Sequence, residues 1–142
     1  MSPVSVDVED LIMAFEHHDA MGEHYLDRKT GEVLYISEDY IDEEDMQQLR
    51  AEPSRYVLIE PVESSTGFEV MAEFTESLPI GEARRELEFA LNQRHPFRRF
   101  KDVLLNYPKI REEWFRFHNE AFTKIARNWL EENQVEATLS RR

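Results

Sequence analysis

The sequence predicts an α+β fold: an N-terminal helix, a three-stranded antiparallel sheet and a C-terminal layer of about four helices. Short β-rich runs fall before residue 63, and apolar residues recur every three or four positions after it. The chain has 142 residues, 41% of them hydrophobic, which is enough for a buried core. We therefore expect a single domain over residues 1–134, with a helix-plus-sheet part at 1–63, a helical part at 64–134 and a loose tail at 135–142.

The first expected element is a helix from about Val6 to His18. The segment "VSVDVEDLIMAFEHH" begins with alternating residues. It then places apolar side chains at helical spacing, at Val8, Leu11, Ile12 and Phe15. Gly22 follows and is a typical stop signal.

A hairpin and a third strand are expected next. In "EHYLDRKTGEVLYIS", Asp27 suits the first position of the turn, and Gly31 supplies the left-handed residue that closes a hairpin with a bulge. The third strand lies in "RYVLIEPV" and ends at Pro61. Between them, "IDEEDMQQLRAEP" predicts a short acidic helix that is capped by Asp42 and ends before Pro53.

Four helices are expected after residue 63. Thr66 and Glu69 have capping-box spacing for the first helix, and the second lies in "IGEARRELEFALN". Pro96 and Pro108 suit the first turns of the third and fourth helices, and the fourth extends to about Glu132. The expected buried positions are Phe68, Met71, Phe74 and Leu78; Ala83, Leu87, Ala90 and Leu91; Phe97, Phe100, Val103 and Leu104; and Ile110, Trp114, Phe117, Ala121, Ile125 and Trp129.

Three segments resemble a bacterial family of unknown function, uncharacterised protein family 0158. The segments are "YLDRKTGEVLYISE", "GFEVMAEFTESL" and "FRRFKDVLLNYPKIREEWFRFHNEAFTKIARNWLEEN", and they occur in the order that the family shows. The chain departs from the family at residues 93–96, where the family has a glycine-rich lead into a phenylalanine. The resemblance implies a cytoplasmic bacterial α+β protein and supplies no activity.

Composition narrows the class of protein. The chain has no cysteine, which excludes disulfide scaffolds, thiol catalysis and cysteine-based zinc sites and makes the cytoplasm the natural location. No apolar run approaches the roughly 20 residues of a membrane helix, so no membrane partner is expected. The net charge of −13 makes general nucleic-acid binding unexpected. Residues 1–80 carry 20 acidic and 4 basic side chains, whereas residues 81–142 carry 10 and 13.

A basic cluster around residue 96 is the candidate site for an anion or a partner protein. Its members are Arg94, His95, Arg98, Arg99 and Lys101. Guanidinium groups beside a helix N-terminus suit a phosphate or a carboxylate. The alternative is that these cations pair with carboxylates of the same chain, either in the acidic first half or, for Arg98, at Asp102 one helical turn away. The sequence leaves both open.

The last expected helix is dense in aromatic residues, and Phe115 and Phe122 widen its apolar stripe. Trp114 and Trp129 lie on its apolar stripe and are expected in the core; if exposed, either would be an anchor for a partner. Opposite charges at i,i+4 spacing predict ion pairs on its solvent side. These pairs are Glu112–Arg116, Arg116–Glu120, Glu120–Lys124 and Arg127–Glu131.

No metal site or cofactor is expected. The segment "HHDAMGEH" at 17–24 has suitable ligand types, but His17 and His18 diverge by about 100° on a helix. The chain also lacks the common catalytic and phosphate-binding motifs, which favours a role other than catalysis.

Three functions are compatible with the sequence. The first is a binding or regulatory module that grips an anionic group or an acidic partner. The second is an enzyme acting on a phosphorylated or nucleotide substrate, with Arg98 and Lys101 as binding groups and His95 as a proton carrier. The third is a structural subunit of a larger assembly.

Overall fold

The computed structural model describes residues 3–18, 21–37 and 43–140, and its fold is α+β as the sequence predicts. The chain groups into two compact units. The first comprises residues 1–62 and 123–142, and the second comprises residues 63–122. A single domain over residues 1–134 stays a prediction, because two compact units can fold either as one domain or as two.

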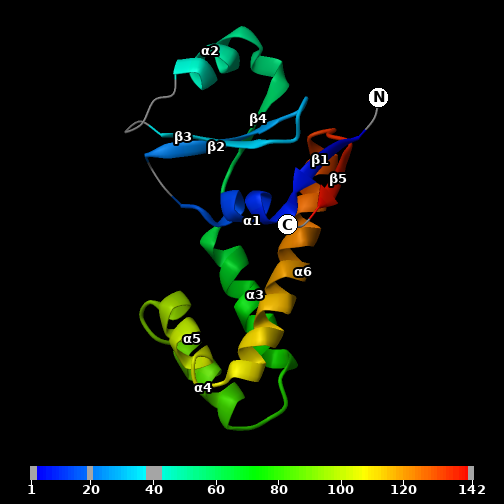
Figure 1. Ribbon diagram of the computed structural model, residues 1–142. Helices are drawn as coiled ribbons and strands as arrows, with labels where there is room; N and C mark the ends of the chain where they lie inside the picture. The colour runs from blue at the N-terminus through cyan, green and yellow to red at the C-terminus, as the bar shows by residue number, and fades with distance from the viewer. Residues whose placement is uncertain (1–2, 19–20, 38–42, 141–142) are drawn as a thin grey trace. The chain divides into compact units, whose positions relative to one another are not determined.

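The first unit contains the expected three-stranded antiparallel sheet (Figure 1). Its strands are β2 (Gly22–Asp27), β3 (Val33–Ser37) and β4 (Tyr56–Ile59), and β2 lies in the centre. In register, His24 pairs with both Tyr35 and Ile59, and Leu26 pairs with Val33. Since directly paired residues share a face, the side chains of these residues lie on one side of the sheet.

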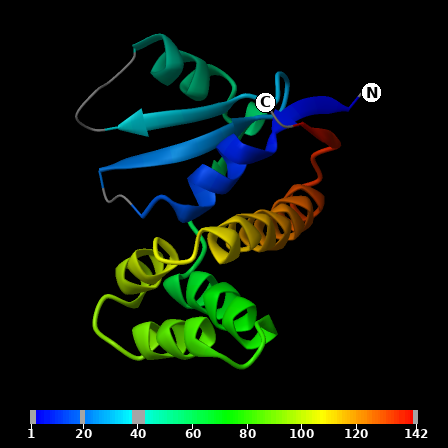
Figure 2. The same ribbon diagram turned by 60° about the horizontal axis from the view of Figure 1, so that its bottom comes forward.

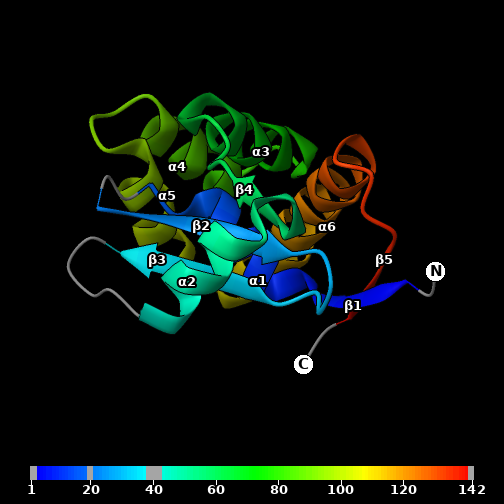
Figure 3. The ribbon, with the colours of Figure 1, turned by 90° about the horizontal axis from the view of Figure 1, so that it is seen from above.

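Two helices cover opposite faces of this sheet (Figures 1 and 3). Helix α1 (Val8–Glu16) buries the predicted apolar stripe of Val8, Leu11, Ile12 and Phe15, and it also buries Ala14. Helix α2 (Glu43–Ala51) buries none of its residues, and a short 3₁₀ turn at Pro53–Arg55 follows it. Gln48 of α2 accepts a hydrogen bond of 3.1 Å from the Tyr56 hydroxyl. The expected cap, Asp42, lies outside the described residues.

The N-terminal helix begins two residues later than predicted, because the preceding segment is a strand. Strand β1 (Val4–Asp7) uses the alternating residues, and Asp7 caps α1 by accepting from the amides of Glu9 at 2.9 Å and Asp10 at 3.3 Å. A capping carboxylate satisfies amides that have no partner within the helix, so it fixes where the helix begins.

The C-terminal segment forms a strand where a loose tail is expected. Strand β5 (Ala137–Ser140) runs parallel to β1, with Val4 opposite Ala137 and Asp7 opposite Ser140. Figure 1 shows the two strands side by side. The expectation of a loose tail is therefore wrong for residues 137–140, because they form backbone hydrogen bonds with the start of the chain.

The hairpin between β2 and β3 has the turn that the sequence predicts. Gly31 has a φ of 81°, and its amide donates to the carbonyl of Asp27 at 2.8 Å. A Cβ atom at Gly31 would collide with the carbonyl oxygen of Ser5. Glycine is thus required here both by backbone conformation and by the close approach of β1.

The second unit is helical, as predicted for this region. It contains α3 (Ser64–Ser77), α4 (Glu82–Leu91), α5 (Pro96–Leu104) and the first part of α6 (Pro108–Glu132). Both prolines occupy the first position of their helices. The predicted capping box is wrong, because α3 begins at Ser64 and Thr66 lies inside its first turn. The amide of Thr66 donates to the backbone carbonyl of Glu63.

An aromatic cluster forms the core of the second unit. The ring of Trp114 lies 5.4 Å from that of Phe74 and 5.0 Å from that of Phe100. Edge-to-face contacts of this kind bury large apolar areas and hold three helices together. Most of the expected inward positions are buried or half-buried; Phe97 is the exception, with 40% of its surface exposed, and it lies over Gly67.

Helix α6 buries two of the positions that the sequence suggests, Trp114 and Phe122, and also Ala126 and Leu130, which lie outside the expected stripe. The other expected positions on the stripe are half-buried, and Phe115 is exposed. None of the helices in the described part of the chain combines the length and apolar character needed to cross a membrane.

Candidate functional site

The segment between α4 and α5 makes a sharp turn at His95. This residue has a φ of 56°, in the left-handed region, and its carbonyl accepts a hydrogen bond of 3.0 Å from the amide of Arg99. Pro96 then begins α5 without needing an amide partner. The turn lies in the segment 93–96, where the sequence departs from the glycine-rich family pattern, and its conformation is one that glycine adopts readily.

The basic cluster is exposed to solvent. The side chains of all its members are exposed; these members are Arg94, His95, Arg98, Arg99 and Lys101. Within the described residues, none of its four cations has a carboxylate within 4.0 Å, and the expected pair of Arg98 with Asp102 is not formed. Arg99 instead donates from Nε to the carbonyl of Arg94 at 2.9 Å. This part of the protein therefore presents cations that form no ion pair with the described carboxylates.

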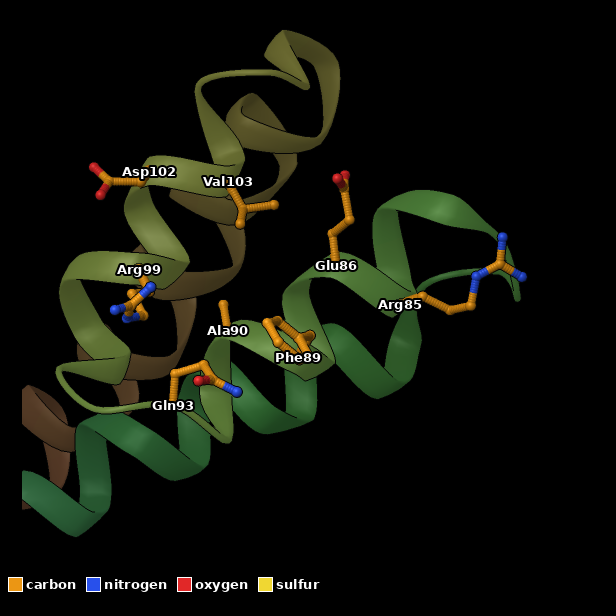
Figure 4. A pocket seen from close by; sticks show the side chains of 8 residues that line it. All are labelled: Arg85, Glu86, Phe89, Ala90, Gln93, Arg99, Asp102 and Val103. Carbon is orange, nitrogen blue, oxygen red and sulfur yellow. The ribbon is translucent and has the colours of Figure 1, made fainter.

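A cleft of about 360 Å³ lies between α4 and α5, next to the basic cluster (Figure 4). Helix α4 packs against α5, and Figure 2 shows the two helices (yellow-green) beside each other. The residues lining the cleft are Arg85, Glu86, Phe89, Ala90, Gln93, Arg99, Asp102 and Val103. Arg99 is thus shared by the cluster and the cleft, whereas His95 is not among the lining residues.

The cleft has an apolar centre and polar ends. In Figure 4, Ala90 and Val103 point toward each other across the two helices, with Phe89 beside them. Arg85 lies toward the start of α4, and Arg99 lies toward the connection between the helices. A site of this composition suits a ligand with both apolar and anionic groups.

Two carboxylates line the cleft, but neither occupies its centre. Glu86 accepts a hydrogen bond from the hydroxyl of Tyr107. This bond, together with burial of the ring, raises the pKa of Tyr107 to about 12. Asp102 points away from α4 (Figure 4). One acidic group is thus hydrogen-bonded to the protein and the other is directed outward.

Phe89 is a member of the site that sequence reasoning missed. It is 67% exposed, which is unusual for a phenylalanine, and it lies one position before the buried Ala90. Successive residues of a helix diverge by about 100°, so a helix that buries Leu87 and Ala90 turns Phe89 toward solvent. The sequence could have indicated this exposure, because Phe89 is an aromatic residue on the polar face of an amphipathic helix.

The two tryptophans do not provide freely exposed anchors. Trp114 is 6% exposed, inside the aromatic core. Trp129 is half-buried and packs edge-on against Phe15, with ring centroids 5.9 Å apart. The exposed aromatic residues of the second unit are instead Phe89, Phe97 and Phe115, among the described residues.

The ladder of ion pairs expected along α6 is not formed. None of its pairs, Glu112–Arg116, Arg116–Glu120, Glu120–Lys124 and Arg127–Glu131, brings its charged atoms within 4.0 Å. Exposed pairs at this spacing contribute little free energy, so long side chains remain solvated. Arg111 instead lies over the ring of Phe115, with its guanidinium carbon 4.9 Å from the ring centroid.

The histidine-rich segment gathers three rings in the first unit. His17 lies 5.1 Å from His24, and Tyr35 lies 5.4 Å and 4.8 Å from them. Residue 19 of this segment lies outside the described residues. In the part of the chain that the structure covers, no three His, Asp or Glu side chains come together as a group able to hold a metal ion.

Fold and site together define an α+β protein whose helical unit carries an open cleft beside an exposed basic cluster. The chain belongs to the uncharacterised protein family UPF0158, whose model matches residues 1–141. It is similar to UPF0158 protein PA5073 of Pseudomonas aeruginosa, with 35% identity over 137 residues, which cover 96% of this chain and 88% of the relative. No solved structure matches the chain.

Proposed function

We propose that the protein is a cytoplasmic binding or regulatory module that captures an anionic segment of a partner protein through the basic cluster. One observation carries the proposal: the four cations of the cluster, Arg94, Arg98, Arg99 and Lys101, are exposed and have no carboxylate within 4.0 Å among the described residues. This is unusual in a chain with 30 acidic and 17 basic residues.

The spacing of these charges suits a short anionic segment. Arg98, Arg99 and Lys101 lie within the first six residues of α5, and Arg94 lies just before it. Arginine can hold a carboxylate with two parallel hydrogen bonds, so guanidinium groups near the start of one helix give both attraction and geometry. A partner that offers two or three carboxylates would satisfy the cluster.

The charge of the whole protein favours a short acidic segment over a nucleic acid. Duplex DNA carries one negative charge for about every 1.7 Å of its length, and its binding proteins usually present an extended basic surface. A chain with a net charge of −13 repels such a polymer over its whole length. A short segment interacts mainly with the local cluster, where cations predominate.

Charge reversal tests this function. The double variant Arg98→Glu, Arg99→Glu should lose partner capture in a pull-down from a bacterial lysate while melting at the same temperature as the wild type. The matched control is Lys109→Glu, Arg116→Glu, which changes the net charge equally at two exposed positions of α6 outside the cleft. Equal capture by the two double variants would contradict the proposal.

A further inference from the structure

We infer that the cleft between α4 and α5 selects acidic peptide segments that carry one apolar side chain between their carboxylates. This inference rests on the proposed function and names the class of partner. The basic cluster alone would bind any anion of suitable size, whereas the adjoining cleft adds a second requirement.

The size of the cleft indicates more than a carboxylate or phosphate site. Its volume of about 360 Å³ falls within the range of pockets that enclose organic ligands, roughly 300–1,000 Å³. A single anionic group would fill a small part of it. One aliphatic or aromatic side chain, with the backbone on either side, is of the right size.

The apolar centre of the cleft provides the reason for an apolar anchor. Phe89 is 67% exposed and lies beside Ala90 and Val103. Burial of exposed apolar surface by a partner contributes favourably to the free energy of binding, and aromatic residues at the centre of an interface contribute most of it. A peptide side chain placed over Phe89 would remove this ring from water.

The charges around the centre indicate where the carboxylates of the peptide lie. Arg85 and Arg99 are near opposite ends of the cleft, as Figure 4 shows. The lining residues extend from Arg85 in α4 to Gln93, two positions past the end of this helix, which corresponds to roughly 12 Å at the rise of a helix. An extended peptide covers that length in about four residues, so one carboxylate on each side of the anchor can reach an arginine.

The carboxylates of this region are outnumbered by its cations. Glu86 accepts the hydrogen bond of Tyr107, and Asp102 points away from α4. Residues 82–104 as a whole carry six basic and four acidic side chains, a net charge of +2 in a protein of net charge −13. Charge complementarity therefore selects an acidic occupant, and the apolar centre selects among acidic peptides.

Fluorescence anisotropy with three labelled probes tests the inference. The probes are a ten-residue peptide of Glu, Ser and Gly, the same peptide with a central Leu, and a ten-nucleotide oligouridine. The wild type should bind the Leu peptide at least about fivefold more tightly than the plain peptide, since the extra affinity comes from apolar burial.

Two single variants locate the effect. Phe89→Ser should abolish the preference for the Leu peptide, so that this variant binds the two peptides with equal affinity. Phe115→Ser is the matched control, because it removes another exposed phenylalanine, 45% exposed on α6, that does not line the cleft. Both replaced side chains are exposed, so both variants should keep the wild-type melting temperature.

The other possible results distinguish between the apolar anchor, the proposed function and the class of partner. Equal affinity of the wild type for the two peptides would refute the requirement for an apolar side chain and leave the proposed function intact. Binding of neither peptide would overturn both, and tighter binding of oligouridine would replace the acidic peptide by a single-stranded nucleic acid. Sedimentation tests a further outcome, in which the wild type self-associates and Phe89→Ser abolishes this self-association. That result would identify a second copy of the chain, and not an acidic peptide, as the occupant of the cleft.

Discussion

Arg55 holds the buried carboxylate of Asp27 through two hydrogen bonds, from Nε to Oδ1 at 2.8 Å and from Nη2 to Oδ2 at 2.7 Å. Asp27 is only 4% exposed, at the end of β2, and its Oδ1 also accepts from the amide of Lys29 at 2.8 Å. The pair joins the hairpin turn to the segment that leads into β4. It therefore fixes the geometry of the sheet at its turn.

Removing this carboxylate should destabilise the protein. Asp27→Ala leaves Nε and Nη2 of Arg55 and the amide of Lys29 without their acceptor, so we expect the free energy of unfolding to fall by about 2–3 kcal/mol in urea titration. This is at the low end for a buried pair, because the Arg55 side chain is 22% exposed. Glu52→Ala removes the exposed partner of Arg55 at 3.3 Å and should change the free energy by less than about 0.5 kcal/mol. Equal losses in the two variants would contradict this account.

The same pair predicts a pH dependence of stability. Burial raises the pKa of Asp27, but hydrogen bonds from Arg55 and from the following turn outweigh this effect and lower the pKa to about 2, from an ordinary value of 3.8. A lowered pKa in the folded state stabilises the protein above pH 3.8, and this contribution is lost as the pH falls toward 2. Between pH 5 and 2 the wild type should lose about 2 kcal/mol more than Asp27→Asn, measured by urea unfolding. Parallel stability curves would show that Asp27 titrates normally.

Gly31 should tolerate no side chain. Gly31→Ala places a Cβ at a φ of 81° and against the carbonyl of Ser5, so we expect a loss of at least about 1–2 kcal/mol and a lower melting temperature. Gly67→Ala is the control. It lies inside α3, and its Cβ would meet only the half-exposed ring of Phe97, at 3.2 Å. Helix propensity there favours alanine by about 0.5–1 kcal/mol, so this variant should be at least as stable as the wild type. Similar melting temperatures for the two variants would refute the close approach of β1 to the turn.

Tyr107 should ionise only at strongly alkaline pH. Its hydrogen bond to Glu86 raises the pKa of the phenol to about 12. Because the folded state favours the neutral phenol, this contribution to stability is present below pH 10 and is lost as the pH rises toward 12. Glu86→Gln should bring the pKa down toward 10.0, as followed by the ¹³Cζ shift of labelled tyrosine, whereas Glu112→Gln should leave it unchanged. A wild-type Tyr107 that titrates near pH 10 would contradict the assigned bond.

Local signals in the sequence predicted most of the elements. The hairpin followed from Asp27 and Gly31, and the starts of α5 and α6 followed from Pro96 and Pro108. The pairing of β1 with β5 was not predictable, because it joins opposite ends of the chain and each strand has only four residues. Such pairing depends on tertiary structure, which no local pattern records.

The candidate site was predictable only in its charges. Arg94, Arg98, Arg99 and Lys101 stand out as a basic run in an acidic chain. The cleft depends on how α4 packs against α5, which sets the gap that Phe89 and Val103 border. Exposed ion pairs failed as predictions for a related reason: their free energy is too small to fix the position of flexible side chains.

The α4–α5 region is proposed to capture an anionic segment. Titration of ¹⁵N-labelled protein with the Leu-containing glutamate peptide, followed by amide chemical shifts, tests this proposal most directly. The largest changes should fall within residues 85–103, while the signals of β1 and β5 should stay in place. Changes centred on the three-stranded sheet, or no change at saturating peptide, would contradict the account.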